Sequence, residues 1–434
     1  MSDSDALMWA IEKDPMLRST ITTVVVLDGE VEADRLHRTF DRLSRVVPRL
    51  RQRVRSNPLS IAPPRWEFDP NFDLRYHLRP ARVPGTGSMS DLLAMAAPIA
   101  MQGFDRARPL WEATEVEGLS DGRSAIILKI HHSITDGVGG VRLMLELFDL
   151  EKDADERAMP PAPSVHVKNQ TERFVDAFQY ETRRQLAQAK KATGTGIDSL
   201  IGAVYDPTGS AVASSELIGS LSSHFDVLTM PLDVAKQVAH NIGGTLNDTF
   251  VAGIAMGMRR YHHLHDTEPP ALRMGMPIST RDGTLPHSAG NAFVPARFEV
   301  PIDIDDPAEL MAALRRRVLA ARDEPANQLV EPVSTLLNRL PTSIVTQVFG
   351  TMMRGLDFQA SNVPGSPVPV YLLGVPVSAV FPFGPLAGAA VNVTLLSYQN
   401  ELNVGVNVDP AAVPDVDALM ECLRDAYDDL LELG

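Results

Sequence analysis

The chain has 434 residues, of which 44% are apolar, and this length exceeds what a single hydrophobic core usually serves. Its formal net charge of −15 argues against nucleic acid as a partner, because phosphate binding needs a positive surface. One cysteine, Cys422, excludes an intrachain disulfide, and no apolar stretch approaches the roughly 18 to 20 residues of a membrane span. We therefore expect a cytoplasmic protein with two domains or a pseudo-duplicated pair.

The first half of the chain mixes strand-like runs with amphipathic helices. Residues 22–29 form an apolar run that predicts a strand ending in a turn, and residues 32–47 follow with apolar side chains at helical spacing. A second helix is expected over residues 88–104, with Ser88 or Ser90 as its N-cap. Two strands joined by a turn, and then another helix, are expected at residues 109–119, 124–130 and 141–150.

Two basic stretches stand out against the acidic composition. In residues 45–56 the arginines at 49, 51, 53 and 55 alternate with other residues, as on one face of a strand. A charged edge strand is favoured here over a phosphate-binding patch, because edge charge protects against aggregation. Residues 173–191 predict a helix with a cationic end, for which a solvated face is favoured over a lid or a membrane-surface contact.

The second half repeats the mixture after a polar segment, residues 150–222, that is rich in proline and small residues. We expect an N-terminal half at 1–165, a helical crossover at 166–222 and a C-terminal half at 223–434. Its helices are expected at residues 231–240, 245–261 and 416–433, and its strands at 273–280, 292–300, 369–375, 378–383, 389–399 and 402–409. This order predicts a mixed α/β fold.

The string HHSITDG, residues 131–137, is the strongest chemical signal in the chain. On a strand, alternation places His132 on the same side as the wholly apolar series before it and His131 on the opposite side with Lys129. An imidazole at the end of an apolar face can act as a base near neutral pH. Asp136 is close enough to turn back and fix the loop, and Gly137 with the following glycines permits a tight turn into a helix.

HHSITDG matches the HHxxxDG motif of the chloramphenicol-acetyltransferase-like acyltransferases, and further strings resemble the bacterial wax ester synthase/diacylglycerol acyltransferase family. They are a PLW motif, an ND motif, a Pro-x-Ser-x-Arg string and a Gly-Asn pair, carried by Pro109, Leu110, Trp111, Asn247, Asp248, Pro277, Ser279, Arg281, Gly290 and Asn291. The likeness runs from about residue 4 to 432. It implies two chloramphenicol-acetyltransferase-like domains, each a mixed β-sheet with flanking helices, and an active-site tunnel at their interface.

The resemblance also implies the activity and the roles of the residues. Fatty acyl-CoA and a long-chain alcohol or diacylglycerol would be the substrates, with His132 as general base, Asp136 as loop anchor, and neither cofactor nor metal. The implied supporting residues are His131, Gly137, Asn247 and Asp248. The implied tunnel residues are Pro109, Leu110, Trp111, Ser279, Arg281 and Asn291. Peripheral contact with a membrane or lipid inclusion is left open.

Several of these residues have a purely structural alternative. Trp111 on a strand is more often core than substrate wall. Thr245 and Asp248 approximate a capping box, so helix capping and shaping of the site carry equal weight for the ND motif. The string YHHLHD at 261–266 fits an exposed helix end better than a metal site, and the G-x-S-x-G pattern at 118–122 fits a hairpin turn better than a nucleophile elbow.

Two other functions share the motif or the fold. The first is a condensation-domain-like acyltransferase that forms an amide or an ester. The second, from another class, is a catalytically silent lipid-binding protein. The intact HHxxxDG string argues against this alternative. Release of CoA thiol that depends on an added alcohol would separate these alternatives.

Overall fold

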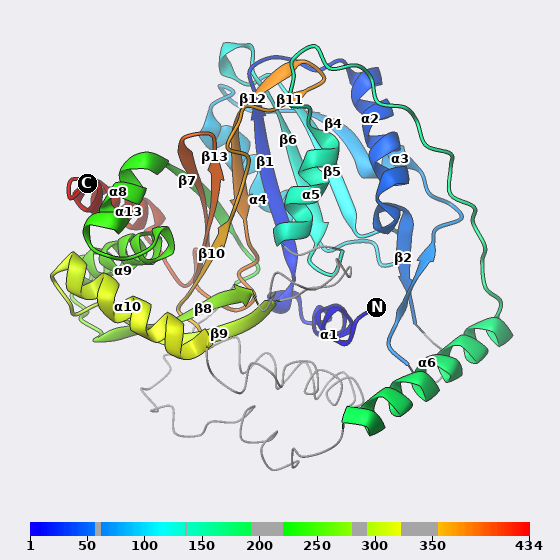
Figure 1. The fold of residues 1–434 in the computed structure, drawn as a ribbon. Coiled ribbons are helices and arrows are strands. Elements are labelled where there is room, and N and C mark those ends of the chain that lie inside the picture. Colours follow the sequence, from blue (N-terminus) through cyan, green and yellow to red (C-terminus); the bar gives the residue numbers. More distant parts are fainter. Residues whose placement is uncertain (57–61, 135–136, 192–219, 280–292, 323–354) are drawn as a thin grey trace.

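The computed structural model describes residues 1–56, 62–134, 137–191, 220–279, 293–322 and 355–434, and their strands form two large mixed sheets and one small sheet (Figure 1). In spatial order the first large sheet contains β11 (Tyr371–Leu372), β12 (Val375–Phe383), β1 (Thr20–Leu27), β6 (Ser124–His131), β5 (Trp111–Glu117) and β4 (Leu78–Arg82). Only the β4–β5 pair is parallel.

Helices cover both faces of this sheet. One face packs against α2 (Ala33–Val46) and α5 (Gly137–Leu147), whose buried side chains join those of β6 in one core cluster. The opposite face packs against α4 (Met89–Met101), which begins in a capping box between Ser88 and Asp91. The helices expected at 32–47, 88–104 and 141–150 are present as α2, α4 and α5, and Ser88 is the cap of α4, because their apolar residues follow the helical period and bury one side.

The second sheet contains, in order, β7 (His224–Pro231), β14 (Glu401–Val408), β13 (Val391–Tyr398), β10 (Phe358–Val363), β8 (Ala271–Ser279) and β9 (Phe293–Pro301). Its core cluster includes residues of α8 (Leu232–Asn241), α9 (Leu246–Leu264), α10 (Pro307–Arg322) and α13 (Val416–Leu431). The expected mixed α/β architecture in two halves is therefore confirmed. Three of its elements, β7, β10 and α10, were not among the expected ones.

The C-terminal half contributes two strands, β11 and β12, to the first sheet. β12 comes from the C-terminal part of the chain but pairs antiparallel with β1 from Thr22 to Leu27, at the heart of the first sheet. Where β12 passes β14, a Cβ added at Gly405 would overlap the Pro382 carbonyl, so the two backbones touch. The division at residue 223 did not anticipate that these two strands join the first sheet, because strand periodicity does not say which strands pair.

The basic stretch at 45–56 is not a single strand. Pro48–Arg51 is a short 3₁₀-helix, and only β2 (Gln52–Arg55) is extended, pairing with β3 (Arg65–Phe68). The proline and the buried Leu50 start a helical turn where alternation alone predicted an extended chain. Arg51 forms an ion pair with Asp41, and Arg53 lies 3.4 Å from Asp69. These pairings disfavour a phosphate-binding patch.

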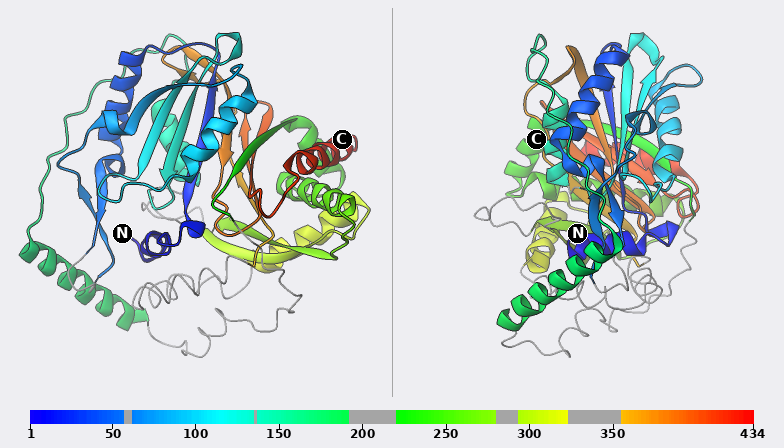
Figure 2. Two further views of the ribbon diagram at one scale, coloured as in Figure 1. Left: turned by 180° about the vertical axis from the view of Figure 1, so that it is seen from behind. Right: turned by 90° about the vertical axis from the view of Figure 1, so that its right-hand side faces the viewer.

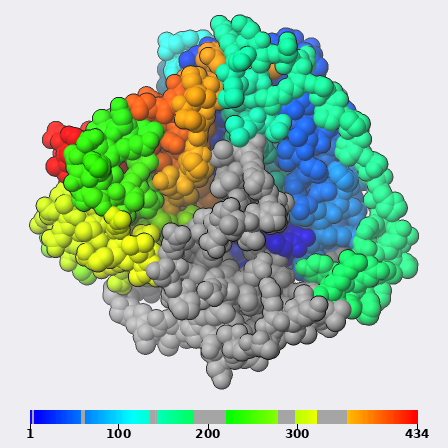
Figure 3. All heavy atoms as spheres, in the orientation of Figure 1, coloured from blue at the N-terminus to red at the C-terminus, as the bar shows by residue number. Residues whose placement is uncertain are grey.

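The crossover runs along the outside of the N-terminal half. Residues 150–169 carry no helix or strand apart from an isolated bridge of the neighbouring Asp149, and lead to α6 (Gln170–Lys191) at the rim of the molecule (Figures 2 and 3). Phe174 and Phe178 on α6 are exposed. Among the helices that the structure describes, none has the length and apolar character to cross a bilayer.

Candidate active site

The HHxxxDG motif begins on β6, one of the two central strands of the first sheet. All of β6 is buried, and it pairs with β1 on one side and β5 on the other. The residues that pack toward α2 and α5 are Ile126, Leu128 and Ile130. Lys129 and His131 therefore face the opposite side, as the alternation predicted. The strand ends at His131, so His132 begins the turn instead of prolonging the apolar face.

His132 is half-buried, and its backbone is fixed to the start of the neighbouring strand. Its N–H donates to the Ser19 carbonyl at 2.7 Å, one residue before β1. Gly137 begins α5, as expected of a glycine that turns the chain into a helix. Asp136, the expected anchor of the loop, lies outside the described residues.

His131 is completely buried and held on three sides. Its ring contacts Trp9 and Phe104 edge-on, with centroid distances of 6.0 and 6.1 Å. Its Nδ1 accepts the Ser133 N–H at 3.0 Å, which places the ring proton on Nε2. That Nε2 lies 3.1 Å from Oε2 of Glu12, although the N–H is not aligned with this oxygen as a hydrogen bond. The buried ring thus fixes the backbone of the motif loop through its hydrogen bond with the Ser133 N–H.

Glu12 is a site residue that the sequence analysis missed. It caps the end of α1 (Asp3–Ile11), and its Oε1 accepts the Ser19 N–H at 3.0 Å. Burial by itself raises the pKa of this carboxyl, but the contact with His131, the Ser19 N–H and the nearby Arg106 together lower it by more, so the net shift of the pKa is downward. Nothing in the local sequence distinguishes Glu12 from an ordinary exposed helix residue.

A buried lysine continues the same face of β6. Nζ of Lys129 lies 3.7 Å from Oε2 of Glu112 on β5 and 4.5 Å from the ring centre of Phe104. Burial lowers the pKa of Lys129, an effect that Glu112 opposes. A lysine inside a strand of otherwise apolar residues was the only sequence signal for this pair.

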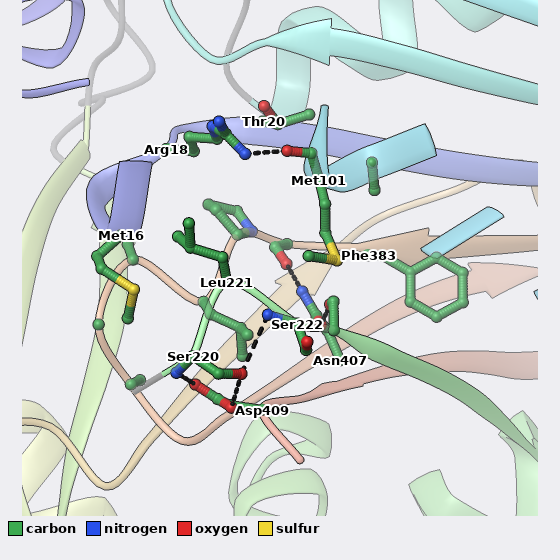
Figure 4. Close-up of a pocket in the computed structure, with 18 of the residues that line it drawn as sticks. Met16, Arg18, Thr20, Met101, Ser220, Leu221, Ser222, Phe383, Asn407 and Asp409 are labelled. Atoms are coloured by element: carbon green, nitrogen blue, oxygen red, sulfur yellow. Dashed lines mark hydrogen bonds between the residues drawn. The ribbon is translucent and has the colours of Figure 1, made fainter. Parts of the chain in front are cut away.

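A pocket lies between the halves, next to the start of β1 (Figure 4). It encloses about 720 Å³, including its open mouth. One wall is the series Arg18, Thr20 and Thr22, and the other comes from residues 220–223 and 383–390 with Asn407 and Asp409. His132 does not line it, but Thr20 is the cross-strand partner of His131, so pocket and motif meet across β1 and β6.

The two walls differ in their polar groups. On the C-terminal side, Asp409 accepts from the backbone and hydroxyl of Ser220 at 2.6 and 2.7 Å. On the β1 side, the hydroxyls of Thr20 and Thr22 are buried and have no hydrogen-bond partner among the described residues. A buried hydroxyl without a partner carries a desolvation cost, which a bound molecule with an acceptor group would relieve.

The PLW residues lie in the core of the first half. Pro109, Leu110 and Trp111 are buried, and the Trp111 indole N–H donates to the Leu50 carbonyl at 2.7 Å. The indole is stacked between the rings of Phe40 and His77, and none of the three residues lines the pocket. This position fits the core role of Trp111 and not the tunnel role.

The ND motif starts α9. Asp248 accepts from the backbone and the hydroxyl of Thr245, both at 2.8 Å, and the capping box is complete. Asn247 is half-buried, with its Nδ2 3.9 Å from the Met276 sulfur. The capping role of Asp248 is therefore confirmed. Ser279 ends β8 without its side chain being described, and Arg281 and Asn291 lie outside the described residues.

The two weaker patterns have local explanations. The histidines after Tyr261 lie at the exposed end of α9, where Nδ1 of His265 bonds to the Tyr261 carbonyl at 2.9 Å. Residues 118–122 form the turn between β5 and β6, in which Asp121 and Gly122 have positive φ. The hairpin-turn interpretation is thus confirmed.

Comparison with known proteins identifies relatives along the whole chain. A model described as the wax ester synthase/diacylglycerol acyltransferase catalytic domain matches residues 1–250, and one described as the WS/DGAT C-terminal domain matches residues 289–431. The Mycobacterium tuberculosis protein Rv2484c, named as a candidate diacylglycerol O-acyltransferase, is 33% identical to this chain. The alignment covers 99% of this chain and 91% of Rv2484c. Tgs1 of the same species, similarly named, is 28% identical, with 90% and 88% covered.

Solved structures share the fold. A wax ester synthase/diacylglycerol acyltransferase from Marinobacter aquaeolei VT8 superposes with a TM-score of 0.65 at 20% identity, with 99% of this chain and 98% of that chain covered. The starter condensation domain of rhizomide synthetase gives 0.61 at 13% identity, with 100% and 93% covered. Because the catalytic-domain model spans more than half of the sequence and Rv2484c aligns over nearly all of it, the chain belongs to the wax ester synthase/diacylglycerol acyltransferase family of O-acyltransferases.

Proposed function

We propose that the chain joins a fatty acyl group from acyl-CoA to the hydroxyl of a long-chain alcohol or a diacylglycerol, with His132 as general base. The observation that carries the proposal is the place of His132: half-buried at the end of β6 and fixed to Ser19, beside the strand whose Thr20 lines the pocket. An imidazole there can accept a proton at neutral pH.

In the proposed reaction His132 removes the hydroxyl proton while the alcohol oxygen attacks the thioester carbonyl. The C–O bond forms, the C–S bond breaks, and the imidazole returns its proton to the departing thiolate of CoA. General-base catalysis of this kind contributes about 10²- to 10⁴-fold, so positioning of both substrates and exclusion of water must supply the remainder. Exclusion of water also protects the thioester from hydrolysis.

The surroundings support this proposal. Asp136, with Gly137, is proposed to hold the loop that carries His132, and Asn247 to shape the site. The pocket is lined by apolar groups such as Met16, Leu221 and Phe383 beside the threonine hydroxyls, a mixture that suits a molecule with a long alkyl chain and polar groups. Because both acceptors reside in lipid, peripheral contact with a membrane or lipid inclusion is part of the proposal.

The test combines two readouts. With palmitoyl-CoA as donor, we expect free CoA thiol only after hexadecanol or diacylglycerol is added, and the ester should appear on thin-layer chromatography. His132→Ala should lower the rate by about 10²-fold or more without changing the melting temperature. His37→Ala, which removes an exposed histidine of α2, is the matched control and should retain full activity.

Other results would contradict the proposal in distinct ways. Near-wild-type ester formation by His132→Ala would remove the general base. Thiol release that requires an amine instead of an alcohol would favour condensation-type chemistry. Binding of palmitoyl-CoA without turnover of any acceptor would favour a silent lipid-binding protein.

A further inference from the structure

The carboxylate of Glu12 contacts the first histidine of the pair and the residue to which the second is bonded. Oε2 lies 3.1 Å from Nε2 of His131, and Oε1 accepts the backbone N–H of Ser19 at 3.0 Å. The carbonyl of the same Ser19 accepts the N–H of His132 at 2.7 Å. One side chain from the N-terminal helix thus links the ring of the first histidine to the backbone that holds the second.

We propose that Glu12 is the positioning residue of the HHxxxDG loop, acting on the base through His131 and Ser19. This inference rests on the proposed function, because it assigns Glu12 a part in the same proton transfer. A small displacement of His132 would lengthen its path to the alcohol proton, and misplacement by about 1 Å can cost 10²-fold in rate.

The chemistry requires a carboxylate at this position. Nδ1 of His131 accepts from Ser133, so the ring carries its proton on Nε2, the atom that lies 3.1 Å from Oε2 of Glu12. Ser19 presents a second proton to the same group. A carboxylate offers an oxygen to each donor, whereas an amide offers one oxygen and would direct its NH₂ group at the other donor. Glutamine has the size of glutamate but cannot satisfy both contacts.

The position of α1, which carries Glu12 at its end, is itself fixed by contacts with other parts of the chain. Ser2 caps its start, and Trp9, one turn before Glu12, contacts the His131 ring. The guanidinium of Arg106 lies 3.6 Å from the centre of the Trp9 ring and donates to the Trp9 carbonyl. Three contacts therefore fix the helix end from which Glu12 reaches the motif.

The experiment compares Glu12→Gln with the wild type in acyl transfer from palmitoyl-CoA to hexadecanol. We expect kcat to fall about 10- to 100-fold with the KM values little changed, because positioning acts on the transition state. In ¹⁵N-histidine-labelled protein, the low-field resonance of the buried His131 Nε2 proton should shift in the variant. Glu421→Gln, an exposed glutamate on α13, is the matched control and should change neither readout.

A merely structural role would give other results. Glu12→Asp retains the charge but is one methylene shorter, so an intermediate kcat supports positioning. In the double-mutant cycle of Glu12→Gln with His131→Gln, the two effects on kcat should be non-additive. Unchanged kcat in Glu12→Gln, or a loss that only follows a lowered melting temperature, would overturn the proposal. If the wild type itself transfers no acyl group, the proposed function fails, while the resonance still shows whether Glu12 holds the ring.

Discussion

His77 shows how one buried side chain ties the stability of the first half to pH. It is completely buried at the end of α3 (Leu74–His77), stacked on Trp111, and its Nδ1 donates to the Trp111 carbonyl at 2.7 Å. Burial lowers its pKa to about 4, because the charged imidazole would lose its hydration, and the bond to Trp111 opposes this only in part.

From this depressed pKa we predict a loss of stability in mild acid. Between about pH 6.5 and pH 4 the unfolded chain binds a proton at His77 that the folded chain does not, so the free energy of unfolding falls as the pH falls. The loss is on the order of 3 kcal/mol when complete. Urea unfolding of the wild type and of His77→Gln from pH 7 to pH 4 measures it, and the variant should show a shallower dependence.

The matched control is His37→Gln, since His37 is exposed and its removal should leave the pH dependence of the wild type unchanged. Parallel curves for the wild type and His77→Gln would show that another group is responsible.

At the scale of elements, the crossing of α9 and α13 depends on a glycine. A Cβ added at Gly253 would overlap the ring of Tyr427, and that ring cannot turn away freely because its hydroxyl donates to the Phe250 carbonyl at 2.7 Å. We predict that Gly253→Ala lowers the free energy of unfolding by about 1 to 3 kcal/mol through overpacking. Urea denaturation measures the change.

Gly140→Ala is the control for the helix-forming preference of alanine, since the structure shows open space around Gly140 in α5. It should leave stability unchanged or raise it by up to about 1 kcal/mol. A stabilised Gly253→Ala variant would show that α13 shifts without cost.

Elements could be predicted from the sequence where the residue pattern within a single segment determines the structure. The helices α2, α4 and α13 follow from their apolar period, and the motif at the end of β6 from its residue types. Glu12 could not be predicted, because its role arises from contacts with Ser19 and His131 that only the folded chain creates. The core position of Trp111 was the favoured alternative, yet only its stacking between Phe40 and His77 distinguishes it from a tunnel wall.

At the scale of the whole molecule, β12 makes the N-terminal half dependent on the C-terminal half. Without it, β1 loses one of its two neighbours, and the buried Val24 and Val26 lose the contacts of Phe381 and Phe383. We predict that residues 1–165 produced alone aggregate or melt without cooperativity, whereas the full chain melts cooperatively, because an exposed central strand invites pairing with other chains. Calorimetry and light scattering measure both.

Co-expression with residues 166–434 is the control, since the second fragment supplies β12 and should restore a soluble complex. A monomeric 1–165 fragment with a sharp melting transition would show that the N-terminal half folds without β12.

The pairing of β12 with β1 also limits how the two halves can move. A motion that separates these two strands would break the backbone hydrogen bonds that join them. For the proposed reaction, we therefore expect the long alkyl chain of the acceptor to enter lengthwise, and turnover to slow as that chain becomes stiffer or branched.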